Sequence, residues 1–253
     1  MSFDVAAEAY GRFMGRFSEP LAAEFAGFAG VTPGDRVLDV GCGPGALTQR
    51  LVDLLGADRV AAIDPSAPFV EATRRRCPGV EVRTGTAEEL PFPDAAFDAA
   101  LAQLVVHFMR DPVAGIRRMT RVTRPGGTVA SCVWDHAGGS GPLSPFWDVV
   151  HRLDPDAGDE STLAGVREGD LARIFSDAGL GEPVQDRLGV RVDYPSFDVW
   201  WEPYTLGVGP AGDYLGGCST EQVEDIRRAC SDRLGSGPFS IRAVAWAVRA
   251  TRN

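Results

Sequence analysis

A glycine-rich turn with an acidic residue just before it is the feature of the sequence best suited to bind a ligand. The stretch VLDVGCGPG, which begins at Val37, predicts the end of a strand followed by the start of a helix. Glycines at such a turn let the backbone bend tightly and approach a ligand closely. Gly41, Gly43 and Ala46 also satisfy the GxGxxG/A pattern of dinucleotide-binding proteins, so the glycines alone do not select the ligand.

Asp39, two residues before the first glycine of the turn, favours a cationic ligand group over a phosphate. A pyrophosphate binds to bare N–H groups at the positive end of a helix, and a carboxylate repels it. The same carboxylate attracts the ammonium group of an amino-acid ligand. S-adenosylmethionine carries such an ammonium and no phosphate. We therefore expect this ligand in preference to a dinucleotide.

A second acid, Asp64, ends the next predicted strand about 20 residues after the glycine turn. An acid at this position can accept hydrogen bonds from both ribose hydroxyls of a nucleoside. Pro65 holds Asp64 in an extended conformation, and Ser66 is suited to cap the following helix. NAD and S-adenosylmethionine both contain the ribose, so Asp64 predicts a nucleoside without choosing between them.

Between residues 31 and 134, short β-rich runs alternate with amphipathic segments. This alternation predicts a parallel, doubly wound α/β sheet with right-handed crossovers. In such a sheet the glycine turn and Asp64 lie together at the carboxyl ends of the strands, where ligands bind. The expected strands are 36–40, 59–64, 80–84, 97–103 and 128–134, and the expected helices are 46–55, 68–77 and 113–123.

The remaining segments are expected to complete the sheet and to cover the ligand. Apolar residues at helical spacing in residues 1–30 predict an N-terminal helical lid, in which Tyr10, Phe13 and Met14 close over the cofactor. Residues 135–253 predict the end of the sheet with a cap insertion packed over one edge. That half is expected to contain strands 184–194 and 240–250, helices 146–153, 169–178 and 220–234, the aromatic stretch 197–204 and a glycine-rich loop.

Five motifs, in order, resemble the class I S-adenosylmethionine-dependent methyltransferases, in the branch that includes enzymes similar to those of ubiquinone and menaquinone biosynthesis. They cover about 100 residues. The resemblance implies a single domain with a Rossmann-like, seven-stranded methyltransferase sheet. The motifs are VLDVGCGPG, the acid Asp64, GTAEELPFPDAAFD at 85–98, QLVVHFMRDP at 103–112 and RVTRPGGT at 121–128.

The resemblance also implies the cofactor contacts. The glycines of the turn would lie against the methionine part, with Asp39 and the backbone carbonyl of Gln103 near the ammonium. Asp64 would hold the ribose, and the Ala87 amide would meet the adenine ring. Thr86 replaces the usual Asp that accepts from the adenine amino group, and Glu88 or a water would substitute. The expected cofactor-binding residues are Asp39, Gly41, Cys42, Gly43, Asp64, Pro65, Ser66, Thr86, Ala87, Glu88 and Gln103.

Two histidines are candidates for acid–base chemistry. His107 follows the strand 97–103 and His136 follows the strand 128–134, so both lie on the ligand-bearing edge of the predicted sheet. An imidazole with its ordinary pKa of about 6.5 can accept a proton near neutral pH. A structural role is the alternative for each. Their spacing matches no metal-binding motif, and no metal site is expected.

Charge and composition exclude several classes of function. The net charge is −10, which opposes nucleic-acid binding, and all 25 cationic residues are arginines, which excludes a lysine nucleophile. No apolar run approaches the roughly 18 residues of a membrane helix. The N-terminus lacks the order of a signal peptide, so the expected compartment is the cytoplasm.

We therefore predict an S-adenosylmethionine-dependent methyltransferase that acts on an O, N or C atom of a small molecule, without nucleic-acid or membrane partners. Two other functions stay open. One is a non-catalytic, regulatory S-adenosylmethionine-binding protein. The other is an NAD-dependent oxidoreductase built on the same sheet, although Asp39 counts against it.

Overall fold

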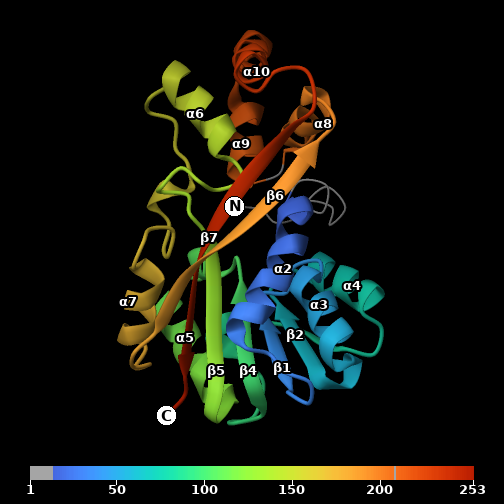
Figure 1. Ribbon diagram of the computed structural model, residues 1–253, viewed down its shortest axis with the longest axis vertical. Coiled ribbons are helices and arrows are strands. Elements are labelled where there is room, and N and C mark those ends of the chain that lie inside the picture. The colour runs from blue at the N-terminus through green and yellow to red at the C-terminus, as the bar shows by residue number, and fades with distance from the viewer. Residues whose placement is uncertain (1–13, 208) are drawn as a thin grey trace.

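The protein is built on a mixed sheet of seven strands in the order β3-β2-β1-β4-β5-β7-β6, as seen in a computed structural model that describes residues 14–207 and 209–253 (Figure 1). β7 runs antiparallel to both of its neighbours, β5 and β6, and the other pairings are parallel. The expected Rossmann-like, seven-stranded sheet is confirmed. Its strands are β1 (Val37–Val40), β2 (Val60–Asp64), β3 (Glu81–Thr84), β4 (Phe97–Gln103), β5 (Thr123–Trp134), β6 (Val184–Tyr194) and β7 (Phe239–Thr251).

Helices cover both faces of the sheet because successive strand residues point to opposite sides. In β4, Leu101 packs into a core with α2 and α3, whereas Ala100 packs into a second core with α5 and α7. α4 packs over β2 and β3. These helices are α2 (Arg16–Ala29), α3 (Ala46–Leu55), α4 (Ala67–Arg76), α5 (Pro112–Val122) and α7 (Asp170–Asp177).

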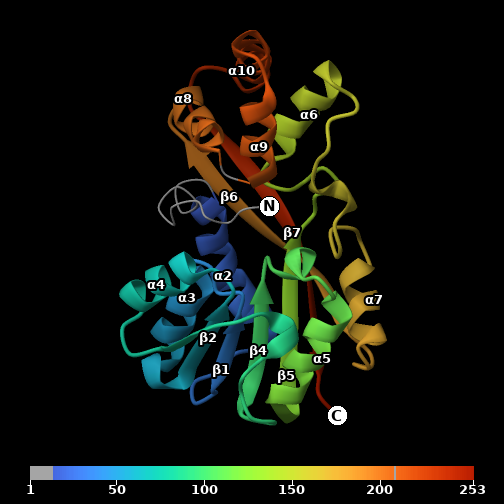
Figure 2. The ribbon, with the colours of Figure 1, turned by 180° about the vertical axis from the view of Figure 1, so that it is seen from behind.

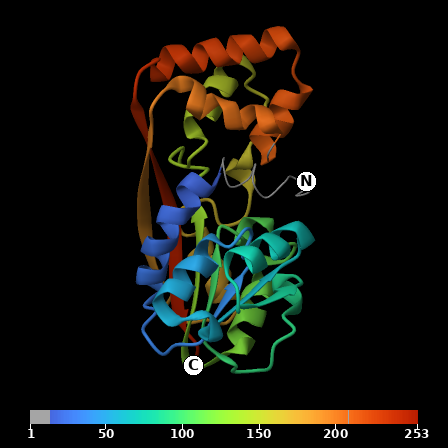
Figure 3. The ribbon, with the colours of Figure 1, turned by 90° about the vertical axis from the view of Figure 1, so that its right-hand side faces the viewer.

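A group of helices stands beyond the carboxyl ends of the central strands, joined to the sheet by the long strands β6 and β7 (Figures 2 and 3). We call this group the cap. It contains α6 (Ser144–Leu153), α8 (Phe197–Trp201), α9 (Gly209–Gly217) and α10 (Thr220–Leu234). Aromatic rings hold it together: the rings of Phe146 and Tyr204 stack at 4.8 Å, and Trp200 is buried beside Tyr204. The aromatic stretch 197–204 is therefore cap core.

Two expected boundaries are corrected. The glycine-rich segment expected to be a loop contains the helix α9, because Ala211 and Leu215 are buried and anchor it to the cap. A Cβ at Gly212 would lie 2.6 Å from the backbone of Gly207, so a larger residue there would prevent this close packing. β5 begins at Thr123 instead of residue 128, since Thr123 pairs with Phe97 across a register shift.

The segment expected to form the N-terminal lid is described only from Met14 onward. Tyr10 and Phe13 lie outside the described residues. α2 packs against α3 and β6, and its Glu19 forms an ion pair with Arg76 of α4 at 3.1 Å. Within the part of the chain that is described, no helix is long and apolar enough to cross a membrane. The division into parts at residues 30 and 134 stays a prediction.

Candidate functional site

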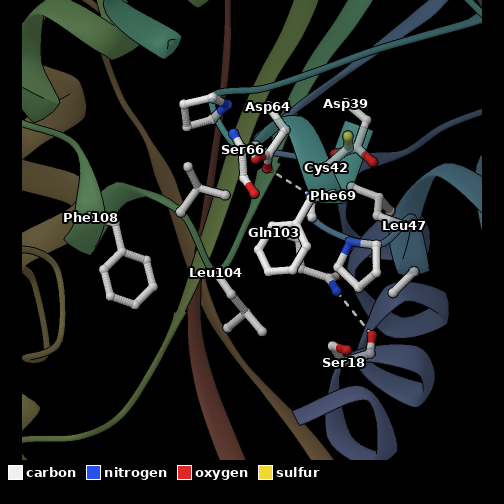
Figure 4. Close-up of a pocket in the computed structure, with 16 residues that line it drawn as sticks. Ser18, Asp39, Cys42, Leu47, Asp64, Ser66, Phe69, Gln103, Leu104 and Phe108 are labelled. Carbon is white, nitrogen blue, oxygen red and sulfur yellow. Dashed lines mark hydrogen bonds between the residues drawn. The ribbon is translucent and has the colours of Figure 1, made fainter. Parts of the chain in front are cut away.

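Two adjoining hollows lie at the carboxyl ends of β1, β2 and β4, and together they form the groove discussed below. The first is lined by the glycine turn, Asp39, Asp64 and Gln103 (Figure 4). The second is lined by residues 85–89 and 108–111. Both hollows share the residues Gly41, Pro65, Val105 and Phe108.

The glycine turn is fixed to the neighbouring strand and leaves no room for a side chain at its first glycine. The N–H groups of Gly41 and Cys42 both donate to the carbonyl of Ile63, at 2.7 and 3.0 Å. Gly41 has a φ of +72°, and a Cβ there would lie 2.5 Å from Cγ2 of Val105. Gly43 also has a positive φ, +53°, but a Cβ there would meet nothing within 4 Å.

Asp39 presents an unsatisfied carboxylate oxygen at this groove. Its side chain is fully buried, and Oδ2 accepts a hydrogen bond from the Thr48 hydroxyl at 2.6 Å. Oδ1 has no hydrogen-bond partner among residues 14–207 and 209–253. Burial, opposed by Thr48 and reinforced by the charge of Asp64, raises the pKa of Asp39 to about 7. An unpaired buried carboxylate is costly, so Asp39 fits a ligand with a cationic group.

Asp64 holds the turn and the following helix together. Oδ2 accepts from the Gly43 N–H and Oδ1 accepts from the Ser66 N–H, each at 2.8 Å (Figure 4). Burial raises the pKa of Asp64 above its ordinary value, although these two N–H donors partly oppose the rise. Ser66 is at the N-cap position of α4 but its side chain makes no capping hydrogen bond, contrary to expectation. The carboxylate of Asp64 engages its backbone instead.

Gln103, at the end of β4, connects the groove to α2. Its side-chain Nε2 donates to the Ser18 carbonyl at 2.9 Å, and its Oε1 is buried without a partner in the described part of the chain (Figure 4). Ser18 and Phe69 also line the first hollow, and the sequence analysis did not identify either. No motif points to them, because they reach the groove from α2 and α4 through packing alone.

Thr86, Ala87 and Glu88 line the second hollow. Ala87 and Glu88 belong to the short 3-10 helix η3 (Ala87–Glu89), and Thr86 is exposed just before it. Oε1 of Glu88 accepts from the backbone N–H groups of Arg110 and Asp111, at 2.9 and 3.3 Å. Burial alone would raise the pKa of Glu88, but backbone N–H donors lower it.

The two histidines lie beside each other but outside the groove lining. Their ring centroids are 6.0 Å apart, and the ring of His107 lies 3.8 Å from that of Phe108, which lines both hollows. Burial, with a contribution from His136, lowers the pKa of His107 to about 3. Burial also lowers the pKa of His136 to about 4. The expectation of an ordinary imidazole pKa is therefore wrong, and both rings are neutral at pH 7.

The described residues contain no group of three His, Cys, Asp or Glu side chains placed to hold a metal ion. The polar groups that line the first hollow include Oδ1 of Asp39 and Oε1 of Gln103, which have no partner among the described residues, and the carboxylate of Asp64. These hydrogen-bond acceptors suit an organic ligand with a cationic end and hydroxyl groups.

Comparison with known proteins agrees with this geometry. Residues 38–131 match the family described as "Methyltransferase domain". An uncharacterised methyltransferase of Mycobacterium tuberculosis is 42% identical over 100 residues, which are 40% of each chain. The demethylmenaquinone methyltransferase of Renibacterium salmoninarum is 36% identical over 42% of this chain and 44% of its own length. The chain thus spans less than half the length of these curated relatives.

A solved structure shows the same fold over nearly the whole chain. It is a Haloferax volcanii protein described as a methyltransferase, determined in complex with its Trm112 activator. It superposes with a TM-score of 0.63 at 20% identity, over 98% of this chain and 93% of its own. At that identity the likeness concerns the fold. Residues 38–131 therefore match the methyltransferase domain family, and the fold around them is that of a solved methyltransferase.

Proposed function

We propose that the protein transfers a methyl group from S-adenosylmethionine to an O, N or C atom of a small molecule. The observation that carries this proposal is the buried Asp39, which lines the groove together with Asp64 and the glycine turn and whose Oδ1 has no hydrogen-bond partner among the described residues. S-adenosylmethionine supplies an electrophilic methyl group on a sulfonium. The protein's own contribution is then to orient the two substrates and to exclude water.

Within this proposal the residues of the groove have separate roles. Asp39, with the backbone carbonyl of Gln103, receives the ammonium of the cofactor, while Asp64 receives its ribose hydroxyls. The backbone N–H of Ala87 meets the edge of the adenine ring, and Thr86 and Glu88 lie beside the same ring. Gly41 and Gly43 permit close approach of the backbone. Cys42, Pro65 and Ser66 complete the lining of the groove.

The small-molecule acceptor is supported by charge and by a relative. The Renibacterium relative is named for the methylation of demethylmenaquinone, which is not a macromolecule. The chain carries a net charge of −10, which repels the phosphates of DNA and RNA. We expect gel-shift assays at about 150 mM salt to detect no binding of either nucleic acid. Salt-sensitive, micromolar binding would contradict the small-molecule assignment.

His107 is proposed as a positioning or acid–base residue next to the groove. A general base contributes about 10²- to 10⁴-fold to kcat when its pKa lies near the working pH, and His107, with a pKa of about 3, is a much weaker base. We therefore expect His107→Ala to lower kcat by less than about 10²-fold, chiefly through the position of Phe108, and to leave S-adenosylhomocysteine affinity within a few-fold. Because the pKa of His107 is about 3, its titration should cause no loss of kcat between pH 8 and pH 5. An unchanged kcat in the variant would assign His107 to structure.

Turnover separates the proposed enzyme from a regulatory binding protein. The protein would be incubated with methyl-labelled S-adenosylmethionine and a metabolite extract, and products carrying the label would be identified by mass spectrometry. We expect a labelled small molecule whose amount, at a cofactor concentration below saturation, is strongly reduced with an Asp39→Asn variant. Binding of S-adenosylmethionine without any labelled product, across extracts rich in acceptors, would favour the regulatory alternative.

A further inference from the structure

A third hollow, which shares no lining residue with the groove, is lined by His136, one of the two histidines. It is bounded by the loop that follows β5, by α6 and by the short 3-10 helix η5 (Glu160–Thr162). Its volume is about 270 Å³. Five titratable residues line it: His136, Asp148, His151, Asp159 and Glu160. We call it the acidic hollow.

Glu160 is the central feature of the acidic hollow. Its side chain is 5% exposed, and Oε2 has no hydrogen-bond partner in the described part of the chain. Burial, opposed by its own backbone N–H and by Trp147, raises the pKa of Glu160 to about 7. A buried carboxylate without a partner is stable only if a cation or a donor meets it. Among the described residues, Trp147 is the side-chain donor that opposes the rise in pKa, and none makes a hydrogen bond to Oε2 itself.

The other charged groups around the hollow define what it accepts. Asp159 uses Oδ1 to accept from the Ser161 N–H at 2.9 Å, and its Oδ2 lies 3.8 Å from Nε2 of His151. Asp148 is neutralised by Arg233. Arg167 is exposed and donates to the Ser161 carbonyl at 3.2 Å, so its charge is directed to the backbone. His136, with its pKa of about 4, adds no positive charge at pH 7.

An aromatic wall completes the hollow. Trp147 is buried, and its ring stacks on that of His151 with centroids 5.8 Å apart and planes inclined by 20°. Ammonium groups are attracted to the faces of aromatic rings, tryptophan above all. The hollow also falls just below the roughly 300–1,000 Å³ of typical small-molecule pockets, which suits a small amine or the amine end of a larger molecule.

We propose that the acidic hollow binds the ammonium group of a small organic amine, with Glu160 and Asp159 as counter-charges and Trp147 as the apolar wall. A phosphate or carboxylate ligand would be repelled by the two acids. The rings of Phe108, His107 and His136 form a row from the groove to this hollow. The amine therefore belongs either to the methyl acceptor or to a separate ligand that binds next to the groove.

Calorimetry with 2-phenylethylamine, and with 2-phenylethanol as its uncharged counterpart, tests the proposal at pH 7.5 without cofactor. We expect the amine to bind at least tenfold more tightly than the alcohol. Glu160→Gln keeps the size of the side chain and removes its charge, so it should weaken amine binding at least tenfold. Glu168→Gln is the matched control, because Glu168 is exposed and does not line the hollow. This variant should bind the amine with the same affinity as the wild type.

Proton release provides a second readout that folding defects do not imitate. Because an ammonium stabilises the ionised form of Glu160, amine binding at pH 7 should release a substantial fraction of one proton. Titration in two buffers of different ionisation enthalpy measures this number, and Glu160→Gln should abolish it. Asp159→Asn should weaken binding while leaving the proton release in place.

Equal affinity for the amine and the alcohol, or an unchanged affinity in Glu160→Gln, would overturn the proposal. So would the absence of amine binding at millimolar concentration. S-adenosylhomocysteine binding in the groove is measured separately, so a failure of the amine site is distinguishable from a failure of the methyltransferase assignment. If the amine binds, incubation with S-adenosylmethionine shows whether the bound amine is the methyl acceptor. Methylation of the amine would identify it as the acceptor, and an unmodified amine would identify it as a separate ligand. Both outcomes support the binding site.

Discussion

Gly41→Ala is expected to reduce affinity for S-adenosylhomocysteine at least 100-fold. The new Cβ would lie 2.5 Å from Cγ2 and 2.6 Å from Cγ1 of Val105. Valine has few accessible rotamers, so Val105 cannot move aside without displacing the segment that lines both hollows. The residue would also adopt a φ of +72°, which costs an alanine about 1–2 kcal/mol. Calorimetry and thermal unfolding measure the two effects separately.

Two further variants separate the steric effect from the backbone effect. Gly43→Ala has the backbone strain without a clash, because a Cβ there meets nothing within 4 Å. We expect it to lose only about 1–2 kcal/mol of stability. The double variant Gly41→Ala, Val105→Ala removes the clash and should recover part of the affinity. Binding by Gly41→Ala within threefold of the wild type would show that the ligand does not approach this turn.

Asp39→Asn is expected to weaken S-adenosylhomocysteine binding by about 1.5–3 kcal/mol, as for other hydrogen bonds to charged groups. The amide can still accept from the Thr48 hydroxyl, so the packing of Asp39 is preserved. 5′-Methylthioadenosine lacks the amino-acid part, and its affinity should not change. A parallel loss for both ligands would place the effect of Asp39 on the nucleoside or on folding.

The ionisation of Asp39 also predicts how cofactor affinity depends on pH. In the free protein the pKa of Asp39 is about 7, and a bound ammonium lowers it because it stabilises the charged carboxylate. Affinity for S-adenosylhomocysteine should therefore be full above about pH 7.5 and fall as the pH decreases through 7, approaching tenfold per pH unit. The Asp39→Asn variant should lack this dependence. A flat profile for the wild type between pH 6 and pH 8 would contradict the role of Asp39.

Much of the sheet could be predicted because its signals are local. The strands Phe97–Gln103 and Val184–Tyr194 and the helix Thr220–Leu234 have the predicted bounds, since apolar periodicity marks each of them. α9 was missed because its glycines are typical of loops, and only burial of Ala211 and Leu215 in the cap makes the segment helical. Tertiary packing overrides local propensity there.

The candidate site shows the same division between local and long-range information. The glycine turn and its two acids follow from short motifs at strand ends, and the fold brings them to one groove. The contact of Gln103 with Ser18 joins residues 85 positions apart, and no spacing in the sequence predicts it. The low pKa values of the histidines depend on burial by distant segments. The acidic hollow likewise combines residues of the loop after β5, of α6 and of η5.

The most direct test of the account is a calorimetric titration of the wild-type protein with S-adenosylhomocysteine and, separately, with NAD at pH 7.5. Both ligands contain a ribose whose hydroxyls can donate hydrogen bonds to Asp64. Only S-adenosylhomocysteine also presents an ammonium group to Asp39. We expect S-adenosylhomocysteine to bind with one site per chain and NAD to bind at least 100-fold more weakly. Tight binding of NAD with no binding of S-adenosylhomocysteine would contradict the assignment.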